Sequence, residues 1–190
     1  MGVSMIDKIM SLWGAPKYFA PLYGLAMAAV LGAAFVFQYG FGYQPCILCY
    51  YQRAPYAAAI ALAVAAFAVL CAVDNKKWNA GKMRPANWFQ IYRAIIWVIV
   101  AAMMMGCGIA IYHVGVEQHL WAGPTVCATM GQSGDLDALM LEIMNAKPVR
   151  CDEVAWTLFG ISMAGYNVIL SVILAWVGAV HLRLARGYGW

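Results

Sequence analysis

Charged residues are scarce in this chain of 190 residues, which has only 12 lysines and arginines and 8 aspartates and glutamates. A soluble domain has about 25% charged residues, whereas this chain has 11%, and 65% of its residues are hydrophobic. This composition excludes an ordinary soluble protein and predicts an integral membrane protein. The net charge of +4 is scattered over separate loops, so we expect no nucleic-acid partner.

The chain also lacks the alternation of strand and helix patterns that a soluble thioredoxin-like enzyme would show around a C-x-x-C motif. Long apolar runs flank Cys46 and Cys49 instead. Two thiols at this spacing can close a disulfide ring, or one can attack a bond that the other resolves. Arg53 follows Cys49 by one helical turn, so its charge is expected to favour the thiolate. The motif predicts membrane-associated redox chemistry.

A cleavage site of the signal-peptide type is missing too, so we expect the first span to be retained. Four uncharged stretches have the length needed to cross a bilayer. These expected spans are about 19–39, 53–73, 94–112 and 160–182, joined on the outer side by loops 40–52 and 113–159. The fold class is an all-α integral membrane protein, a four-transmembrane-helix bundle in a single domain, 1–190. Pro55 leaves the start of the second span unplaced, because proline disrupts a helix interior.

The distribution of basic residues predicts the orientation of the bundle. Nine of the twelve basic residues fall on one side: Lys8, Lys17, Lys76, Lys77, Lys82, Arg84, Arg93, Arg183 and Arg186. Basic loops stay in the cytoplasm, so both termini are expected inside and the cysteine loops outside. Within the long outer loop, residues at helical spacing predict a short amphipathic helix on the membrane surface. They are Leu136, Leu139, Met140, Ile143 and Met144.

The expected topology divides the six cysteines into four on the outer side and two within the spans. Cys46 and Cys49 face outward and Cys127 and Cys151 lie in the outer loop, whereas the remaining two are expected to pack inside the spans. The obvious pairs are Cys46 with Cys49 and Cys127 with Cys151, although connectivity does not follow from sequence. Both pairs could be structural. A two-residue ring beside a span would be a poor staple, however, because it restricts very little chain entropy.

Four segments carry a resemblance to a known family. They are PCILCYYQR at 45–53, YHVGVEQ at 112–118, WAGPTVC at 121–127 and CDEVAW at 151–156. Together they resemble the DsbB family of bacterial disulfide bond formation proteins, over nearly the whole chain from the first span to the fourth. A dithiol before the second span, combined with a second cysteine pair after the third, is a far more specific pattern than a lone C-x-x-C.

The resemblance implies an enzyme of the bacterial inner membrane that reoxidises a DsbA-like periplasmic protein of the thioredoxin fold. The electrons pass to a membrane quinone, ubiquinone or menaquinone. It implies that the partner attacks Cys127, and that Cys151, its disulfide mate, then attacks Cys46. Cys49, the leaving sulfur, would interact with the quinone, and Arg53 would stabilise negative charge beside it.

His113 closes the third span and has two interpretations: a ligand of the quinone carbonyl or a solvated helix end. Tyr50, Tyr51, Trp121 and Trp156 could wall the quinone ring, but an aromatic belt at the interface also explains them. We expect no resident metal.

Two other classes compete with this hypothesis. A vitamin K epoxide reductase-like protein also couples thiols to quinones, but its C-x-x-C belongs with a later span. A membrane metal-binding or haem-binding protein would use the outer cysteines or His113, His119 and His181. The expected topology splits these histidines across the bilayer, and structural zinc sites usually have two close cysteine pairs.

Overall fold

A computed structural model of the chain describes residues 16–74, 88–124 and 150–187. Four long helices dominate these residues, because a backbone in lipid must satisfy its own hydrogen bonds. They are α2 (Pro16–Phe35), extended by the π-helix η1 (Val36–Gly40), α3 (Ile47–Asp74), α5 (Trp88–Glu117) and α7 (Met163–Gly187). Their candidate spans contain 25, 26, 30 and 23 residues, and about 20 suffice to cross a bilayer. The predicted all-α, four-span membrane fold is confirmed.

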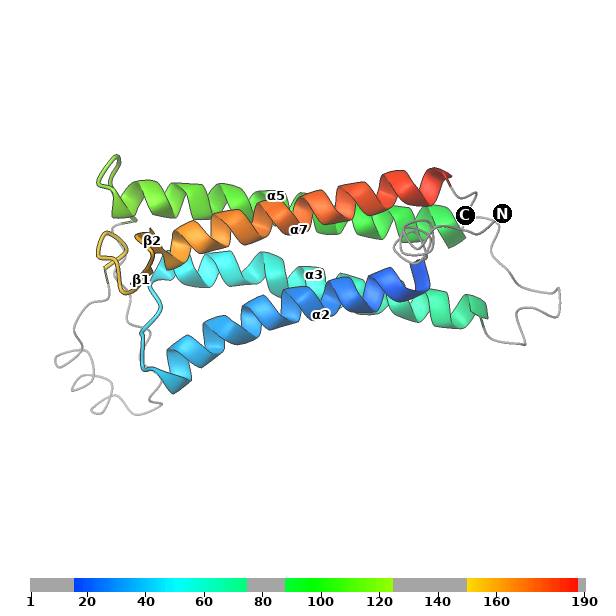
Figure 1. The fold of residues 1–190 in the computed structure, drawn as a ribbon, viewed down its shortest axis with the longest axis horizontal. Coiled ribbons are helices and arrows are strands. Elements are labelled where there is room, and N and C mark those ends of the chain that lie inside the picture. The colour runs from blue at the N-terminus through cyan, green and yellow to red at the C-terminus, as the bar shows by residue number, and fades with distance from the viewer. Residues whose placement is uncertain (1–15, 75–87, 125–149, 188–190) are drawn as a thin grey trace.

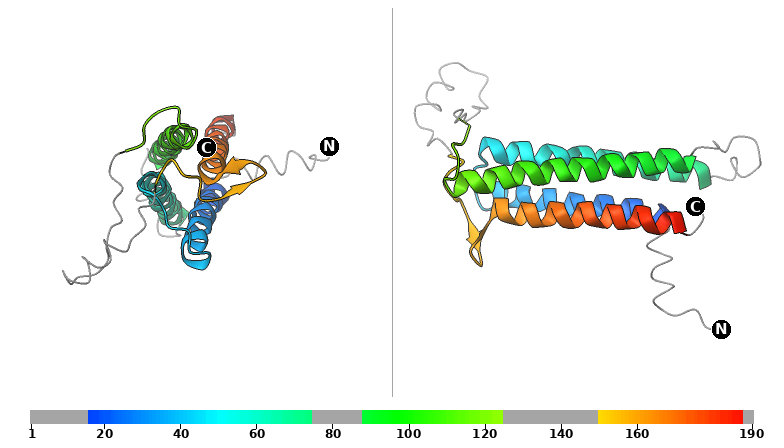
Figure 2. Two further views of the ribbon diagram at one scale, coloured as in Figure 1. Left: turned by 90° about the vertical axis from the view of Figure 1, so that its left-hand side faces the viewer. Right: turned by 90° about the horizontal axis from the view of Figure 1, so that it is seen from above.

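The four helices run side by side as a bundle (Figures 1 and 2). We call the end with Cys46 the cysteine end and the opposite end the far end. α5 packs against both α3 and α7, while α2 packs mainly against α3. Near the far end, the rings of Phe19 and His181 stack 3.6 Å apart, and Tyr23 Oη donates to Leu174 O at 2.7 Å. Towards the cysteine end, α2 diverges from α7 (Figure 1).

Small residues bring the helices into contact, as expected in a membrane, where packing replaces the hydrophobic effect as the driving force. A side chain added at Gly24 would lie 3.0 Å from Ala63 Cβ. Gly106 of α5 similarly gives room to Pro55 of α3. Pro55 therefore sits inside α3 at a close helix crossing and does not end the helix.

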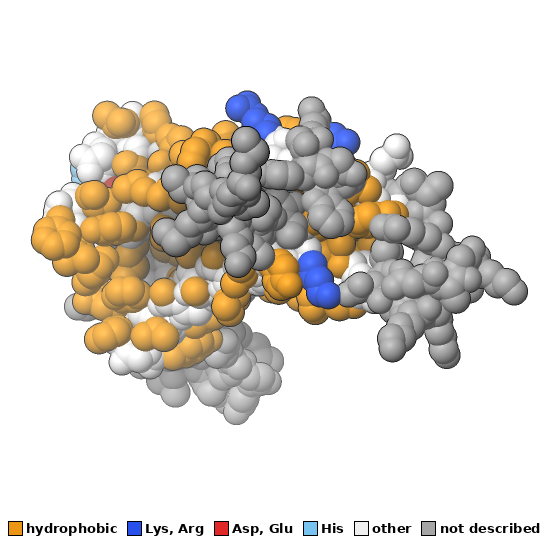
Figure 3. Space-filling model, turned by 45° about the vertical axis from the view of Figure 1, so that its right-hand side comes forward, with side chains coloured by type: hydrophobic (Ala, Val, Ile, Leu, Met, Phe, Trp, Pro, Cys, Tyr) orange, Lys and Arg blue, Asp and Glu red, His pale blue; other side chains and the backbone are white. Residues whose placement is uncertain are grey.

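Large hydrophobic side chains cover most of the described surface on the face shown in Figure 3. Over the whole described surface, the exposed large hydrophobic residues on the spans include Leu22, Leu25, Val64, Phe67, Trp97, Met104, Met105, Ile169 and Trp176. Such a surface would cause aggregation in water, but lipid is its natural solvent.

Two of the helix boundaries that differ from the expected spans lie at the cysteine end. α3 begins at Ile47, so the C-x-x-C motif opens the helix, and α5 continues to Glu117, so His113 is helical. A two-stranded hairpin that we did not predict precedes α7. Its strands β1 (Thr157–Leu158) and β2 (Ile161–Ser162) pair antiparallel. Phe159 and Gly160 both have positive φ, as a two-residue hairpin turn requires. The expected loop helix at 136–144 lies outside the described residues.

Candidate active site

The first cysteine of the motif caps helix α3. The Cys49 N–H donates to Cys46 Sγ at 3.4 Å, and Tyr50 N–H donates to Cys46 O at 3.2 Å, the first helical hydrogen bond. The two sulfurs are 3.2 Å apart and both are thiols. A disulfide needs about 2.05 Å, so a small side-chain rotation would close the ring.

The Cys46 thiol is the hydrogen-bond donor in this pair. It donates a hydrogen bond to Cys49 Sγ, and this bond, together with burial, raises the pKa of Cys46 to about 12. A thiol with so high a pKa is a poor nucleophile at neutral pH. Cys46 therefore suits the role of a sulfur that is attacked rather than one that attacks.

A third cysteine lies beside this pair. Cys151 is buried in a small cluster with Cys46, Leu48 and Val116. The sulfurs of Cys46 and Cys151 and a ring nitrogen of His113 all lie within 4.8 Å of one another. Burial raises the pKa of Cys151 to about 11, opposed by the backbone N–H of Leu48. Two sulfurs that are 105 residues apart in the chain are thus near enough for thiol–disulfide exchange after a small movement.

The residues that flank Cys151 hold each other in an ion pair. Arg150 donates to both carboxylate oxygens of Asp152, at 3.0 and 2.6 Å. This guanidinium holds the pKa of Asp152 below its usual value. The pair is exposed at the surface, so it contributes little to stability, but it restrains the chain on both sides of Cys151.

An apolar cavity of about 360 Å³ opens beside Cys49, where α2 and α7 diverge. Its walls come from α2, η1, α3 and α7, with Trp156 from the loop before β1. Most of the wall surface is apolar. The side chains with polar atoms include Gln38, Tyr43, Gln44, Cys49, Gln52, Arg53, Tyr56, His113, Tyr166 and Asn167. An apolar chamber with a few polar groups is typical of a ligand site.

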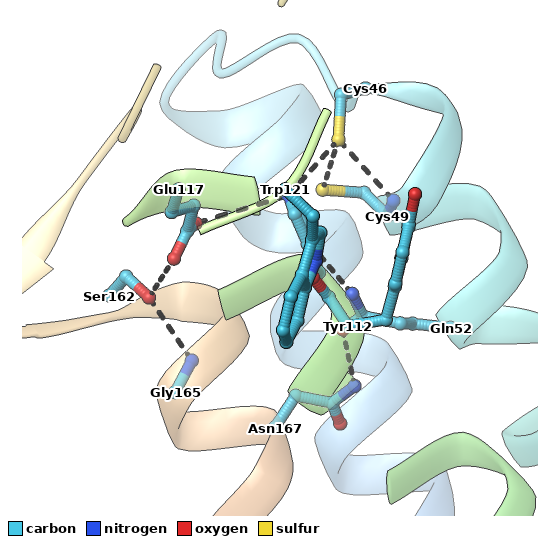
Figure 4. A network of polar contacts seen from close by, with 10 residues as sticks. Cys46, Cys49, Gln52, Tyr112, Glu117, Trp121, Ser162, Gly165 and Asn167 are labelled. Atoms are coloured by element: carbon cyan, nitrogen blue, oxygen red, sulfur yellow. Dashed lines mark hydrogen bonds and ion pairs between the residues drawn. The ribbon is translucent and has the colours of Figure 1, made fainter. Parts of the chain in front are cut away.

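A chain of polar contacts beside the two sulfurs links β2, α5, α3 and α7 (Figure 4). Ser162 donates to Glu117 Oε2, and Glu117 Oε1 lies 3.9 Å from His113 Nε2. On the other side of the ring, His113 Nδ1 is 2.7 Å from Gln52 Nε2, and Asn167 donates to Gln52 Oε1. We call these five residues the polar chain. Gln52, His113 and Glu117 are buried and Ser162 and Asn167 are partly buried, which is possible because they satisfy one another.

His113 is therefore not a solvated helix end. It is 4% exposed, lines the cavity, and its Nε2 lies 3.5 Å from Cys46 Sγ. Since Gln52 Nε2 donates to Nδ1 in the amide orientation observed, the ring carries its proton on Nε2. That proton points towards sulfur.

Arg53 also lines the cavity and is held there by three contacts. It donates to Gln38 Oε1 of η1, and its guanidinium lies 5.2 Å from the ring centre of Phe35 and 5.3 Å from that of Tyr50. Arg53 thus joins the end of α2 to the start of α3, with positive charge at the wall of the cavity.

The segment after α5 folds back against the helix. Trp121 Nε1 donates to Tyr112 O at 2.9 Å, and the two rings stack. A Cβ at Gly115 would meet the Trp121 ring at 1.9 Å. The turn continues to Gly123, where a Cβ would lie 3.9 Å from Cys151 Cβ. Gly115 thus lets the chain return towards Cys151.

We expect Gly115→Ala to lower the free energy of unfolding by about 1–3 kcal/mol, the usual cost of overpacking. Thermal unfolding of the purified protein measures this. Gly108→Ala is the matched control, because a Cβ there meets nothing within 4 Å. Adding Trp121→Ala should remove most of the Gly115→Ala cost. Equal behaviour of the two alanine variants would contradict the packing described.

Five of the six residues predicted from the sequence come together here: Cys46, Cys49, Arg53, His113 and Cys151. Cys127 lies outside the described residues. The sequence analysis missed Gln38, Gln52, Glu117 and Asn167. The sequence could have indicated these residues, because an isolated polar residue within or at the edge of a span usually faces the bundle interior.

The amino-acid sequence matches a family model, described as disulfide bond formation protein DsbB, over residues 16–181. Disulfide bond formation protein B 2 of Pseudomonas syringae is 28% identical over 155 residues, 81% of each chain. Disulfide bond formation protein B of Mannheimia succiniciproducens is 28% identical over 152 residues, 74% of this chain and 75% of that one. An uncharacterised protein of Rickettsia prowazekii is 24% identical over 147 residues, 76% of this chain and 74% of that one. No solved structure matches the chain.

Proposed function

This chain belongs to the DsbB family of disulfide bond formation proteins, and we propose that it is a thiol:quinone oxidoreductase of the bacterial inner membrane. It takes two electrons from a DsbA-like periplasmic dithiol protein and passes them to ubiquinone or menaquinone. Both termini are cytoplasmic and both cysteine loops periplasmic. The observation that carries the proposal is the series of close contacts from Cys151 through Cys46 to Cys49 at the cavity wall.

The first step is an exchange in the outer loop. A partner thiolate attacks Cys127 of a Cys127–Cys151 disulfide, which forms a mixed disulfide and releases Cys151 as a thiolate. The partner's second thiol then displaces Cys127, so the partner leaves with a new disulfide. Gly123 supports this pairing, since it lies against Cys151 and Cys127 is only four residues on, at most roughly 14 Å of extended chain.

The second step moves the electrons to the membrane. Cys151 attacks Cys46 of the Cys46–Cys49 disulfide, which forms a Cys46–Cys151 bond and expels Cys49 as a thiolate. Cys127 then attacks Cys151, which restores the loop disulfide and frees Cys46. The His113 Nε2–H, 3.5 Å from Cys46 Sγ, stabilises negative charge on that sulfur during the exchange. The net result is one oxidised partner and a reduced Cys46–Cys49 pair.

The cavity fits the head group of a quinone. Its walls are apolar, Arg53 and His113 offer hydrogen-bond donors, and Cys49 stands at the wall. When bound, the quinone supplies the acceptor for two electrons and two protons. Arg53 would orient the ring through its oxygen, and its fixed charge favours the Cys49 thiolate. A strong oxidant is needed here, because the potential of DsbA is near −120 mV.

A spectroscopic titration tests this function. Purified protein, mixed with a reduced DsbA-like protein and a short-chain ubiquinone, should bleach the quinone absorbance and oxidise the partner in equal amounts. The Arg53→Lys variant should raise the KM for quinone about tenfold, since a hydrogen bond to a charged group contributes about 1.5–3 kcal/mol. Arg183→Lys, at the far end of α7, is the control. Turnover without quinone, or an unchanged KM in Arg53→Lys, would count against the assignment.

A further inference from the structure

We propose that the reduced chain binds one Zn²⁺ ion through Cys46 Sγ, Cys151 Sγ and His113 Nε2. Among the described residues these three form a compact group of metal-ligand atoms, all within 4.8 Å of one another. They come from three separate parts of the chain: the loop before α3, the interior of α5 and the segment 150–156 that precedes β1. Their convergence is therefore a property of the fold and not of a local motif.

The distances suit tetrahedral zinc. With Zn–S bonds of about 2.3 Å and Zn–N bonds of about 2.0–2.1 Å, two ligand atoms of one ion lie roughly 3.5–3.8 Å apart. Cys46 Sγ and His113 Nε2 are already 3.5 Å apart. Cys151 Sγ, within 4.8 Å of both, has to move by no more than about an ångström to complete the site.

The surroundings complete the requirements of such a site. All three ligands are buried, and two thiolates neutralise the charge of the ion, which a buried site requires. Glu117 Oε1 lies 3.9 Å from His113 Nε2, beside the site but outside the group of three, so a water molecule would take the fourth position. Gln52 Nε2 contacts the other ring nitrogen of His113, Nδ1. A half-turn of its amide would present oxygen to Nδ1–H, the arrangement that orients metal-bound histidines.

The site exists in only one redox state. A disulfide between Cys46 and Cys49, or between Cys46 and Cys151, removes a ligand. The ion therefore binds only when Cys46 and Cys151 are both reduced. This metal is not a resident cofactor of the working enzyme. If the relay proposed above operates, the reduced chain accumulates when quinone is lacking. Zinc would then hold the chain in that state and slow its reoxidation.

Cobalt and zinc titrations of the reduced protein, without partner or quinone, test the site independently of the relay. Co²⁺ should bind in a 1:1 ratio with thiolate-to-cobalt charge-transfer bands and intense tetrahedral d–d bands, and Zn²⁺ should displace it. Cys46→Ala, Cys151→Ala and His113→Ala should each weaken binding by more than the roughly 10–100-fold cost of losing an outer-shell partner. Gln52→Leu should weaken binding by roughly 10–100-fold, because Gln52 contacts His113 only at the ring nitrogen that does not bind the metal.

Three matched variants keep the proposal falsifiable even if His113→Ala does not fold. Cys49→Ala, Cys127→Ala and Cys107→Ala should each retain the cobalt spectrum and the affinity. Loss of binding in Cys49→Ala with retention in Cys151→Ala would place the ion on the C-x-x-C pair and overturn the proposal. Loss in Cys127→Ala would place it on the loop pair, with the same consequence. An octahedral spectrum without charge-transfer bands would also overturn it.

Discussion

The Cys151→Ser variant is expected to lose partner-driven quinone reduction by roughly a thousandfold or more, as when a nucleophile is removed from a catalytic unit. Without Cys151 the loop has no disulfide for the partner to attack and lacks the thiol that we assign to the attack on Cys46. The C-x-x-C pair and the cavity are untouched. A small dithiol such as dithiothreitol can attack the Cys46–Cys49 disulfide directly, so it should still drive quinone reduction in this variant.

Two measurements check this expectation. Quinone absorbance is followed with the reduced partner and, separately, with dithiothreitol, and a non-reducing gel follows the variant mixed with oxidised partner. The free Cys127 thiol should capture the partner as a mixed disulfide, because no loop thiol remains to displace it. Cys71→Ser, on the exposed side of α3, should behave as the unaltered chain. Normal partner-driven turnover in Cys151→Ser would mean that the loop pair is structural.

The Cys49→Ser variant should show the opposite separation. Quinone reduction should cease with the partner and with dithiothreitol alike, because the sulfur at the cavity wall is gone. Cys46 is then a lone thiol within 4.8 Å of Cys151 Sγ. Because the variant lacks the Cys49 sulfur whose hydrogen bond helps to raise the pKa of Cys46, we expect Cys46 to attack the loop disulfide, forming a Cys46–Cys151 bond and releasing Cys127 as a thiol.

Peptide mapping by mass spectrometry under non-reducing conditions detects that cross-link without any quinone. The matched variant is Cys46→Ser, in which Cys49 is the remaining thiol of the motif. There the loop disulfide should stay intact. A Cys49–Cys151 cross-link in Cys46→Ser, together with none in Cys49→Ser, would reverse the roles assigned to the two sulfurs of the motif.

The sequence was sufficient for the number of spans and the choice of helix, because both follow from the length of the apolar runs. It could not place the start of α3. Pro55 argued for a late start, whereas the structure accommodates it inside the helix against Gly106. That compensation comes from another helix, about 50 residues away, and no local pattern reveals it.

The cysteines, Arg53 and His113 could be proposed one by one from the sequence, but the other polar residues around them were missed, and the arrangement of the whole group could not be predicted. The C-x-x-C spacing of Cys46 and Cys49 indicates a redox pair from the sequence alone. The contact of Cys46 with Cys151 depends on where a long loop returns, and the polar chain depends on how three helices are rotated about their axes. His113 had two open interpretations for this reason: its environment is set by Gln52 and Glu117, one of which lies on a different helix. Cys127 and the expected loop helix remain predictions.

The uneven contact between α2 and α7 has a mechanical consequence. Phe19 and Tyr23 join α2 to α7 near the far end. At the cysteine end, α2 is held chiefly by α3, through contacts that include the Arg53–Gln38 hydrogen bond. We therefore expect the far end to act as a pivot, with the motion of α2 largest at η1, beside the cavity. We expect the opening to widen and narrow while the pivot stays packed, so that a bulky ring can exchange with the surrounding lipid without any helix unfolding.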